Sequence, residues 1–267
     1  MSKHLVWKKW GFGVRYYLDP FFGSGQVFWA APHLYRAALN DKNGFVVNFW
    51  RMVQHCTVDK ICDAIEGVFF SELEYHAQKR RLFGLSGDLS DQLKDNFDFF
   101  DFDIGVLWFW LCKLSFPNLK KSAGFSACRW SARDLRNKLA YMRSRIHNKS
   151  TTWLACEDWR EFMIHRGYRS TGLKAPRDIG RPDTAILVDP PYSNSISLYD
   201  LHDDIAYDVY GFFSDYAARY PDARYCVCGW RADLESYFPG WHIIDSPIGN
   251  TRRQGQLEAM AFNKEVA

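Results

Sequence analysis

The chain has 267 residues, of which 47% are hydrophobic, and it carries a formal net charge of +3. This length and composition can fill a hydrophobic core and fit one α/β domain with a substantial insertion. The seven cysteines form no Cys-x-x-Cys pair, which argues against a disulfide framework and against a zinc site. The longest hydrophobic run, near residues 104–112, is too short to span a bilayer, so we expect a soluble, intracellular protein.

The first chemical signal is a glycine-containing turn near the start of the chain. The β-prone run 14–18 is followed by Asp19-Pro20-Phe21-Phe22-Gly23-Ser24-Gly25 and then by residues 26–31, which predicts a strand, a turn and a helix. Glycines at Gly23 and Gly25 can take positive φ and let a ligand approach the backbone. Because the sequence lacks a P-loop ending and a dinucleotide fingerprint, an adenosyl ligand is favoured over a triphosphate. By itself, such a turn is equally typical of any α/β protein.

The middle of the chain predicts an inserted region of a different character. The hydrophobic pattern is helical at 62–70 and 105–114, and residues 88–103 contain six aspartates against one lysine, which we interpret as an acidic linker. We therefore expect residues 61–150 to form a mainly helical insertion, and residues 1–60 and 151–267 to form the catalytic domain.

Positive charge gathers at the end of this insertion. Residues 113–149 carry ten lysines and arginines against one acid, Asp134, although the whole chain has an excess of only +3. A basic run is often a solvated helix face, but here it is also a candidate surface for DNA phosphates. The residues we assign to this surface are Lys113, Lys120, Lys121, Arg129, Arg133 and Arg136.

The second chemical signal is the sequence Asp189-Pro190-Pro191-Tyr192. It follows Thr184–Val188, an apolar run typical of a buried parallel strand. Two consecutive prolines remove two backbone donors and fix φ, so the carbonyl groups near Asp189 become rigid acceptors that suit an amine substrate. The alternative is a strand that simply ends in a Pro-Pro turn, with Asp189 as a local cap.

The remaining pattern completes an α/β sheet. We expect further strands at 153–155, 225–228 and 241–244, a helix at 204–220, and loops at 167–183 and 193–199. In open α/β sheets, ligands bind at the carboxyl ends of the strands. The glycine turn and the diproline sequence could therefore meet over one crevice, although about 160 residues separate them in the chain.

Together, these features resemble the Dam-type DNA adenine-N6 methyltransferases, including their phage and prophage relatives. Residues 39–51 resemble the family's second-strand segment, residues 154–159 its strand-end Asp-aromatic pair, and residues 256–263 its closing strand. The matches occur in the family's order, with the glycine turn first and the proline-rich sequence last. The resemblance implies a Rossmann-like class I methyltransferase fold with a target-recognition insertion.

The resemblance also implies roles for particular residues. S-adenosyl-L-methionine would be the cofactor, and it would be bound by Asp19, Pro20, Phe21, Gly23, Gly25, Asp41, Asp158 and Trp159. Asp41 lies 16 residues after Gly25, where a carboxylate can accept from the ribose hydroxyls. Asp189 and the Pro190 carbonyl would accept the two amino hydrogens of the target base, Pro191 would stiffen the turn, and Tyr192 would stack on the base.

The resulting hypothesis is a DNA methyltransferase that flips adenine out of double-stranded DNA and methylates N6 without a metal ion, as a monomer. Cytosine N4 is the nearest alternative acceptor, because an Asp-Pro-Pro-Tyr sequence can hold either exocyclic amine. A second alternative is a catalytically inactive DNA-binding relative, since only 18 residues precede Asp19 where relatives usually carry a further segment. Methylation of RNA or protein is less favoured, because protein-glutamine methyltransferases typically have asparagine in place of Asp189.

Overall fold

The computed structural model describes residues 6–7, 10, 13–31, 34–67, 71–84, 86–116, 124–125, 132–148, 150–166, 179–191, 205–245 and 257–264. The chain forms two compact units. The first combines Met1–Leu39 with Trp159–Ala267, and the second is Asn40–Asp158. Each unit is described separately below.

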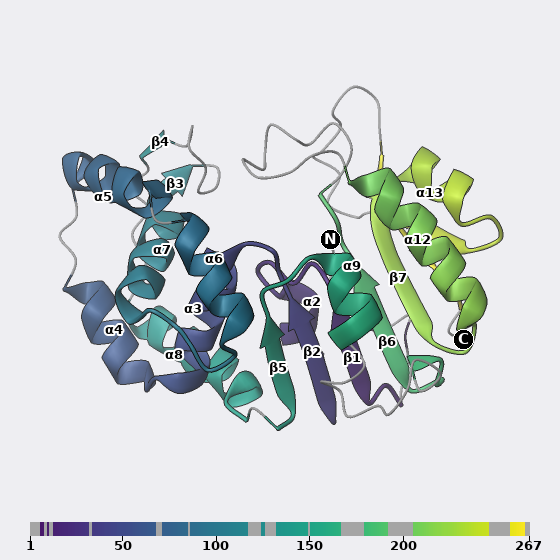
Figure 1. Ribbon diagram of the computed structural model, residues 1–267, viewed down its shortest axis with the longest axis horizontal. Helices are drawn as coiled ribbons and strands as arrows, with labels where there is room; N and C mark the ends of the chain where they lie inside the picture. Colours follow the sequence, from purple (N-terminus) through teal and green to yellow (C-terminus); the bar gives the residue numbers. More distant parts are fainter. Residues whose placement is uncertain are drawn as a thin grey trace. The chain divides into compact units, whose positions relative to one another are not determined.

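The first unit is built on a mixed β-sheet (Figure 1). Its neighbouring strands are β2 (Arg36–Asn40), β1 (Tyr16–Asp19), β6 (Thr184–Val188), β7 (Arg224–Trp230), β9 (Glu258–Phe262) and β8 (His242–Asp245), in that order. The first four are mutually parallel, and β9 runs antiparallel between β7 and β8. The final residue of β2, Asn40, already belongs to the second unit.

Burial explains why these segments form the centre of the sheet. All residues of β1 and β6 are buried, as expected for parallel strands that are covered on both faces and therefore read as continuous apolar runs. The predicted strands near residues 16, 184, 225, 242 and 258 are present. The strand β6 has the predicted ends, and the ends of the others are displaced by one or two residues. The predicted α/β, Rossmann-like class of fold is confirmed.

Helices pack on this sheet. They are α2 (Gln26–Trp29), α9 (Trp159–Glu161), the π-helical turn η1 (Phe162–Arg166), α12 (Ala206–Arg219) and α13 (Arg231–Tyr237). The α12 helix confirms the helix expected at 204–220, and its Tyr210 hydroxyl donates to the Cys228 carbonyl of β7 at 3.2 Å. The α13 helix packs on β7, β8 and β9. Across the described residues, none of the helices has both the length and the apolar character needed to cross a membrane.

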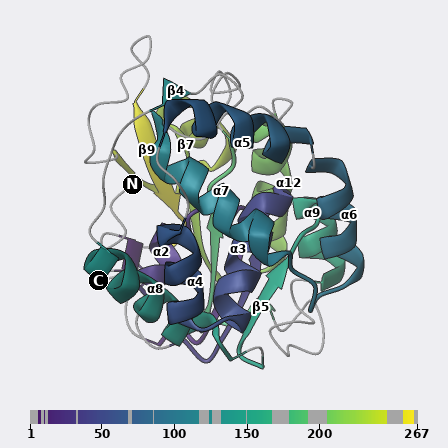
Figure 2. The same ribbon diagram turned by 90° about the vertical axis from the view of Figure 1, so that its left-hand side faces the viewer.

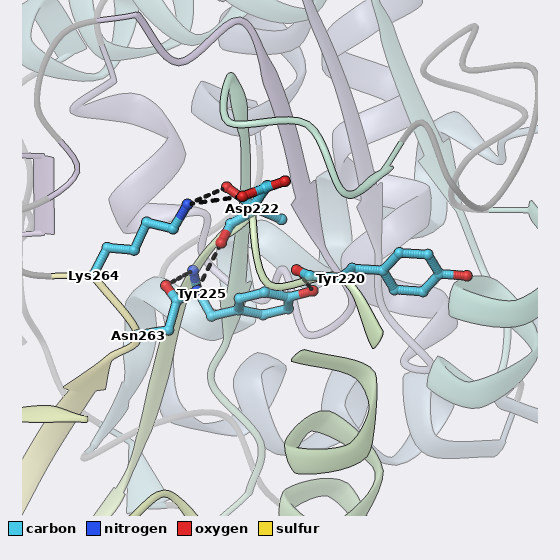
Figure 3. A network of polar contacts seen from close by, with 6 residues as sticks. Tyr220, Asp222, Tyr225, Asn263 and Lys264 are labelled. Carbon is cyan, nitrogen blue, oxygen red and sulfur yellow. Dashed lines mark hydrogen bonds and ion pairs between the residues drawn. The ribbon is translucent and has the colours of Figure 1, made fainter. Parts of the chain in front are cut away.

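An asparagine clip joins the end of β9 to the start of β7 (Figure 3). The Tyr225 amide donates to Asn263 Oδ1 at 2.8 Å, and Asn263 Nδ2 donates to the Ala223 carbonyl at 2.7 Å. Next to the clip, Lys264 Nζ donates to the Asp222 carbonyl at 2.7 Å. One side-chain amide therefore satisfies a donor and an acceptor of the neighbouring backbone, much as a further residue of strand would.

The second unit is mainly helical (Figure 2). Its helices are α3 (Gly44–His55), α4 (Val58–Glu66), α5 (Glu72–Gly84), α6 (Ser86–Asp95), α7 (Phe102–Leu114) and α8 (Ala132–Ile146). Its strands are β5 (Thr152–Ala155) and the short antiparallel pair β3 (Ser115–Phe116) and β4 (Gly124–Phe125). The α3 helix is central, because it packs against α6, α7, α8 and β5. The helical expectations at 62–70 and 105–114 correspond to α4 and α7.

The acidic linker expected at 88–103 is wrong, because residues 86–95 form α6 and α7 begins at Phe102. Leu89 and Leu93 lie four residues apart and are 3% and 0% exposed, in a cluster with Phe45 and Trp110. The aspartates Asp91 and Asp95 stay at the surface. The segment is an amphipathic helix, whose two buried leucines outweigh its acidic composition.

One face of α3 carries three buried polar side chains, Asn48, Arg51 and Gln54, spaced three residues apart. The Arg51 guanidinium donates to four backbone carbonyls at 2.8–3.2 Å, those of Leu93, Asn96, Phe99 and Leu154. Burial lowers the pKa of Arg51 to about 10, so it remains charged at neutral pH. This charge ties both β5 and the connection between α6 and α7 to one helix.

Replacing Arg51 should therefore be costly. We expect Arg51→Met to lower the free energy of unfolding by about 3 kcal/mol, because buried carbonyls lose their charged donor. Urea unfolding followed by circular dichroism measures this value. The exposed Arg80 of α5 provides the control, since Arg80→Met should change stability by less than about 0.5 kcal/mol. Equal losses for the two variants would contradict the role given to Arg51.

Candidate active site

The pairing of β1 with β6 places the two chemical signals at the same edge of the sheet (Figure 1). In this parallel register, Leu18 lies opposite Ile186. Asp19 follows Leu18 by one residue, and Asp189 follows Ile186 by three. Because parallel strands end at a common edge, the glycine turn and the diproline turn leave the sheet from adjacent strands.

The Asp19 side chain is 1% exposed and organises the glycine turn from within. Its Oδ1 accepts from the Phe21 amide at 3.2 Å, and its Oδ2 accepts from the Tyr17 hydroxyl at 2.8 Å. Burial raises the pKa of Tyr17 well above its usual range, and the charge on Asp19 adds to this effect. Tyr17 therefore stays protonated and donates to Asp19, which fixes the turn at the end of β1.

The two glycines of the turn have different reasons to be glycine. Both have positive φ, +49° at Gly23 and +66° at Gly25, a region that other residues avoid. A Cβ at Gly25 would lie 2.5 Å from the Phe22 ring, so local packing excludes a side chain there. A Cβ at Gly23 would have only the Phe21 carbonyl nearby, at 3.9 Å. The turn is therefore closed at Gly25 and open at Gly23.

Aromatic rings lie beside the turn in the first unit. The half-buried Phe21 has its ring centroid 6.1 Å from that of Trp159, the first residue of α9. Trp159 is buried and packs edge-on against Phe212 of α12, at 5.1 Å. The structure thus brings together two residues that the sequence had assigned to cofactor binding, although they are far apart in the chain.

At the end of β6, Asp189 and Pro191 are half-buried, and Pro190 is buried. Tyr192 lies outside the described residues, as do Lys120, Lys121 and Arg129, the loop expected at 193–199 and most of the loop expected at 167–183. Lys113 belongs to α7, but its side chain is not described.

The second unit holds the other two predicted cofactor carboxylates, Asp41 and Asp158, both half-buried. Asn40 Nδ2 donates to the Glu157 carbonyl at 3.1 Å, and the Glu157 amide donates to Asn40 Oδ1 at 3.0 Å. The Asp41 amide donates to the Ala155 carbonyl at 3.3 Å. From the sequence, Asn40 was noted only as part of the Asn-Asp segment that resembles the family, and its side chain was given no role. The one available signal was an asparagine directly before the acidic residue at a strand end.

A buried thiol lies next to these carboxylates. Cys156 belongs to the hydrophobic cluster of Phe45 and Trp110. Burial raises its pKa to about 12, and the charge of Asp41 adds to this effect. The thiol is therefore protonated at neutral pH.

Two of the predicted DNA-contacting side chains are described, both on α8. Arg133 is exposed. Arg136 is paired with Asp59 and Asp63 of α4, the second at 3.5 Å, so it also links α8 to α4. Any contact of either residue with DNA stays a prediction.

The fold and the edge formed by β1 and β6 define a class I methyltransferase. A family model described as "D12 class N6 adenine-specific DNA methyltransferase" matches residues 3–209, and the chain belongs to this family. No curated protein matches the chain. The matched range includes the glycine turn, Asp41, Asp158 and the diproline sequence.

Membership in this family establishes the activity. The protein is an enzyme that methylates N6 of adenine in DNA with S-adenosylmethionine as the methyl donor. The family match confirms the predicted family, the predicted class of enzyme and adenine N6 as the atom that receives the methyl group. It therefore favours adenine N6 over the alternative, cytosine N4. The acceptors present are compatible with this cofactor, because carboxylates such as those of Asp41 and Asp158 can accept from ribose hydroxyls and from an adenine amino group.

The contrast between the two glycines yields a prediction. Gly25→Ala should lower the free energy of unfolding by about 2–3 kcal/mol, because it combines backbone strain with a clash against Phe22. Gly23→Ala, the matched control, should cost about 1 kcal/mol, since it suffers the strain alone. Thermal and urea unfolding of both variants provide the comparison. A larger loss for Gly23→Ala would show that the packing around Gly25 has been misjudged.

Proposed function

We propose that Asp189 and Pro190 hold the amino group of an adenine flipped out of double-stranded DNA. The main support is the parallel pairing of β1 and β6, which puts the Asp189 turn and the glycine turn at one sheet edge. A flipped base is required because N6 in a stacked, paired adenine cannot enter such a site. Opening the duplex costs a few kcal/mol, which contacts to the base and the backbone must offset.

The chemical problem lies in the adenine amino group. Its nitrogen is a poor nucleophile, because its lone pair is delocalised into the ring. The Asp189 carboxylate and the Pro190 carbonyl can each accept one N–H, which favours a tetrahedral nitrogen with an available lone pair. As positive charge grows on that nitrogen, the carboxylate stabilises it before a proton is lost, an effect of preorganised electrostatics. When bound, S-adenosylmethionine supplies an electrophilic methyl group.

The proposed cofactor contacts divide by chemistry. Asp41 would accept from the ribose hydroxyls, and Asp158 from the adenine amino group of the cofactor. In the first unit, Phe21 and Trp159 would provide aromatic surface for the cofactor. The turn residues Asp19, Pro20, Gly23 and Gly25 would shape the space for the rest of the molecule.

The proposed DNA contacts come from Tyr192 and from the basic segment. Tyr192 would stack on the flipped base, with a contribution of about 1–3 kcal/mol. The contacts to phosphates would come from Lys113, Lys120, Lys121, Arg129, Arg133 and Arg136. Residues 61–150 would act as the target-recognition region. We further propose that the enzyme acts as a monomer in the cytoplasm of a bacterial or phage-infected cell, where its DNA substrate is present.

The catalytic assignment is tested by Asp189→Ala. We expect kcat to fall at least about 10²–10³-fold, because the variant loses the acceptor that stabilises developing charge. Binding of S-adenosylhomocysteine, measured by calorimetry, should stay within about twofold of the parent enzyme. N6-methyladenine is quantified by mass spectrometry after digestion of the DNA to nucleosides.

The matched control is Asp183→Ala, which changes the residue just before β6, whereas Asp189 directly follows the strand. Asp183 pairs with Arg181 at 3.0 Å and is not assigned to the reaction. Its replacement should leave kcat within about twofold, because a surface ion pair contributes little. An Asp189→Ala enzyme that methylates DNA at the parental rate would refute the catalytic role.

The DNA-binding role of α8 is tested by Arg133→Ala. We expect weaker DNA binding, and a plot of log affinity against log salt whose slope falls in magnitude by about 1, because one phosphate contact is lost. Fluorescence anisotropy at several salt concentrations gives this slope. Arg219→Ala, which removes an exposed arginine from α12, should leave it unchanged. If both variants keep the parental slope, Arg133 does not contact phosphate.

A further inference from the structure

A second reciprocal asparagine clip lies directly beside the two proposed adenosine carboxylates. The Asn40 side chain is 1% exposed, and it gives one hydrogen bond to the backbone of Glu157 and takes one from it, at 3.1 and 3.0 Å. Asn40 precedes Asp41 in the chain, and Glu157 precedes Asp158. Asp41 and Asp158, the two proposed cofactor-binding residues, are therefore each directly preceded by a residue of this clip.

The backbone reinforces this clip. The Asp41 amide donates to the Ala155 carbonyl at 3.3 Å, so hydrogen bonds join residues 40–41 to residues 155–157 on both sides of the clip. Consecutive Cα atoms are about 3.8 Å apart, so the backbone of Asp41 and that of Asp158 have little freedom to move relative to one another. Asp41 is oriented further, because its Oδ1 accepts from the Asn43 amide at 2.8 Å.

Few other residues could replace Asn40. Its side chain must supply an acceptor and a donor at the same time, in the geometry of a peptide group, and it must do so while buried. A buried hydrogen bond that is lost is costly, so removal of the amide takes from the Glu157 N–H and carbonyl the two bonds that Asn40 makes and weakens the link between the two chain segments.

We propose that Asn40 is a positioning residue, which holds Asp41 and Asp158 at the spacing that binds the adenosine part of S-adenosylmethionine. The inference rests on the cofactor roles proposed above for these two aspartates. It assigns to Asn40 no contact with the cofactor. Its effect should therefore appear in cofactor affinity rather than in the chemical step.

The experiment compares Asn40→Ala and Asn40→Asp with the parent enzyme. Asn40→Asp keeps the size of the side chain and the acceptor for the Glu157 amide, but it places an oxygen against the Glu157 carbonyl. For both variants, the Kd for S-adenosylhomocysteine and the KM for S-adenosylmethionine should rise about tenfold. The kcat at saturating cofactor and the KM for DNA should stay within about twofold of the parent values.

Asn263→Ala is the matched control, because it removes the same kind of clip from the first unit (Figure 3). It should lower the Tm while leaving the Kd for S-adenosylhomocysteine and the KM for S-adenosylmethionine unchanged. Parental affinity in the Asn40 variants, an equal rise in KM for Asn263→Ala, or a fall in kcat without a rise in KM would each overturn the proposal. Failure of both Asn40 variants to fold would also overturn it, since Asn40 would then serve only stability.

Two further variants separate this inference from the proposed cofactor roles. If Asp41→Ala and Asp158→Ala bind S-adenosylhomocysteine like the parent, the cofactor roles themselves are wrong. If they lose affinity and the Asn40 variants do not, only the positioning role fails. In the double variant Asn40→Ala/Asp41→Ala, the loss of affinity should be smaller than the product of the two single losses, because one residue acts through the other. A full product would show that the two act independently.

Discussion

The parallel pairing of β1 and β6 is the constraint on which the proposed active site depends. Because Leu18 lies opposite Ile186, the chain must leave both strands at the same edge, and the glycine turn and diproline turn emerge side by side. The two turns are then shaped locally. Asp19 receives hydrogen bonds from Phe21 and Tyr17, and Pro190 and Pro191 restrict the backbone after Asp189. Long-range pairing and short-range rigidity therefore act on the same few residues.

The second unit uses a different device, in which buried polar side chains bind backbone groups. Arg51 donates hydrogen bonds to four backbone carbonyls, and Gln54 donates to the Thr152 carbonyl at 3.1 Å. Asn40 donates one hydrogen bond to the backbone of Glu157 and accepts one from it. Arg51 and Gln54 lie on α3, and Asn40 is the last residue of β2, four residues before α3 begins. Together they hold β5 at Thr152 and Leu154, and the chain just after the strand at Glu157. The backbone next to Asp41 and Asp158 is therefore held by buried hydrogen bonds.

The errors and omissions of the sequence analysis have physical causes. Residues 88–103 looked like a linker because aspartates dominate the composition, but Leu89 and Leu93 are enough to bind one face of α6 to the hydrophobic cluster. The sequence also contained no sign that Arg136 pairs with acids of α4 that lie more than 70 residues earlier, and its contact with DNA stays a prediction. The composition of a segment shows which side chains are present. Which side chains pair with one another depends on which helices pack together in the folded chain.

The sequence by itself determined the chemistry of this protein. A family and a reaction are indicated by the motifs around Asp19 and Asp189, by the apolar strands before them and by the order of the motifs. This is possible because turn geometry and acceptor groups are local properties of a few adjacent residues. Only the tertiary structure decided how distant residues are held. The burial of Arg51 and the clip between Asn40 and Glu157 both depend on segments that meet only in the folded chain. Hydrogen bonds between residues 117 positions apart leave no periodic trace in a sequence.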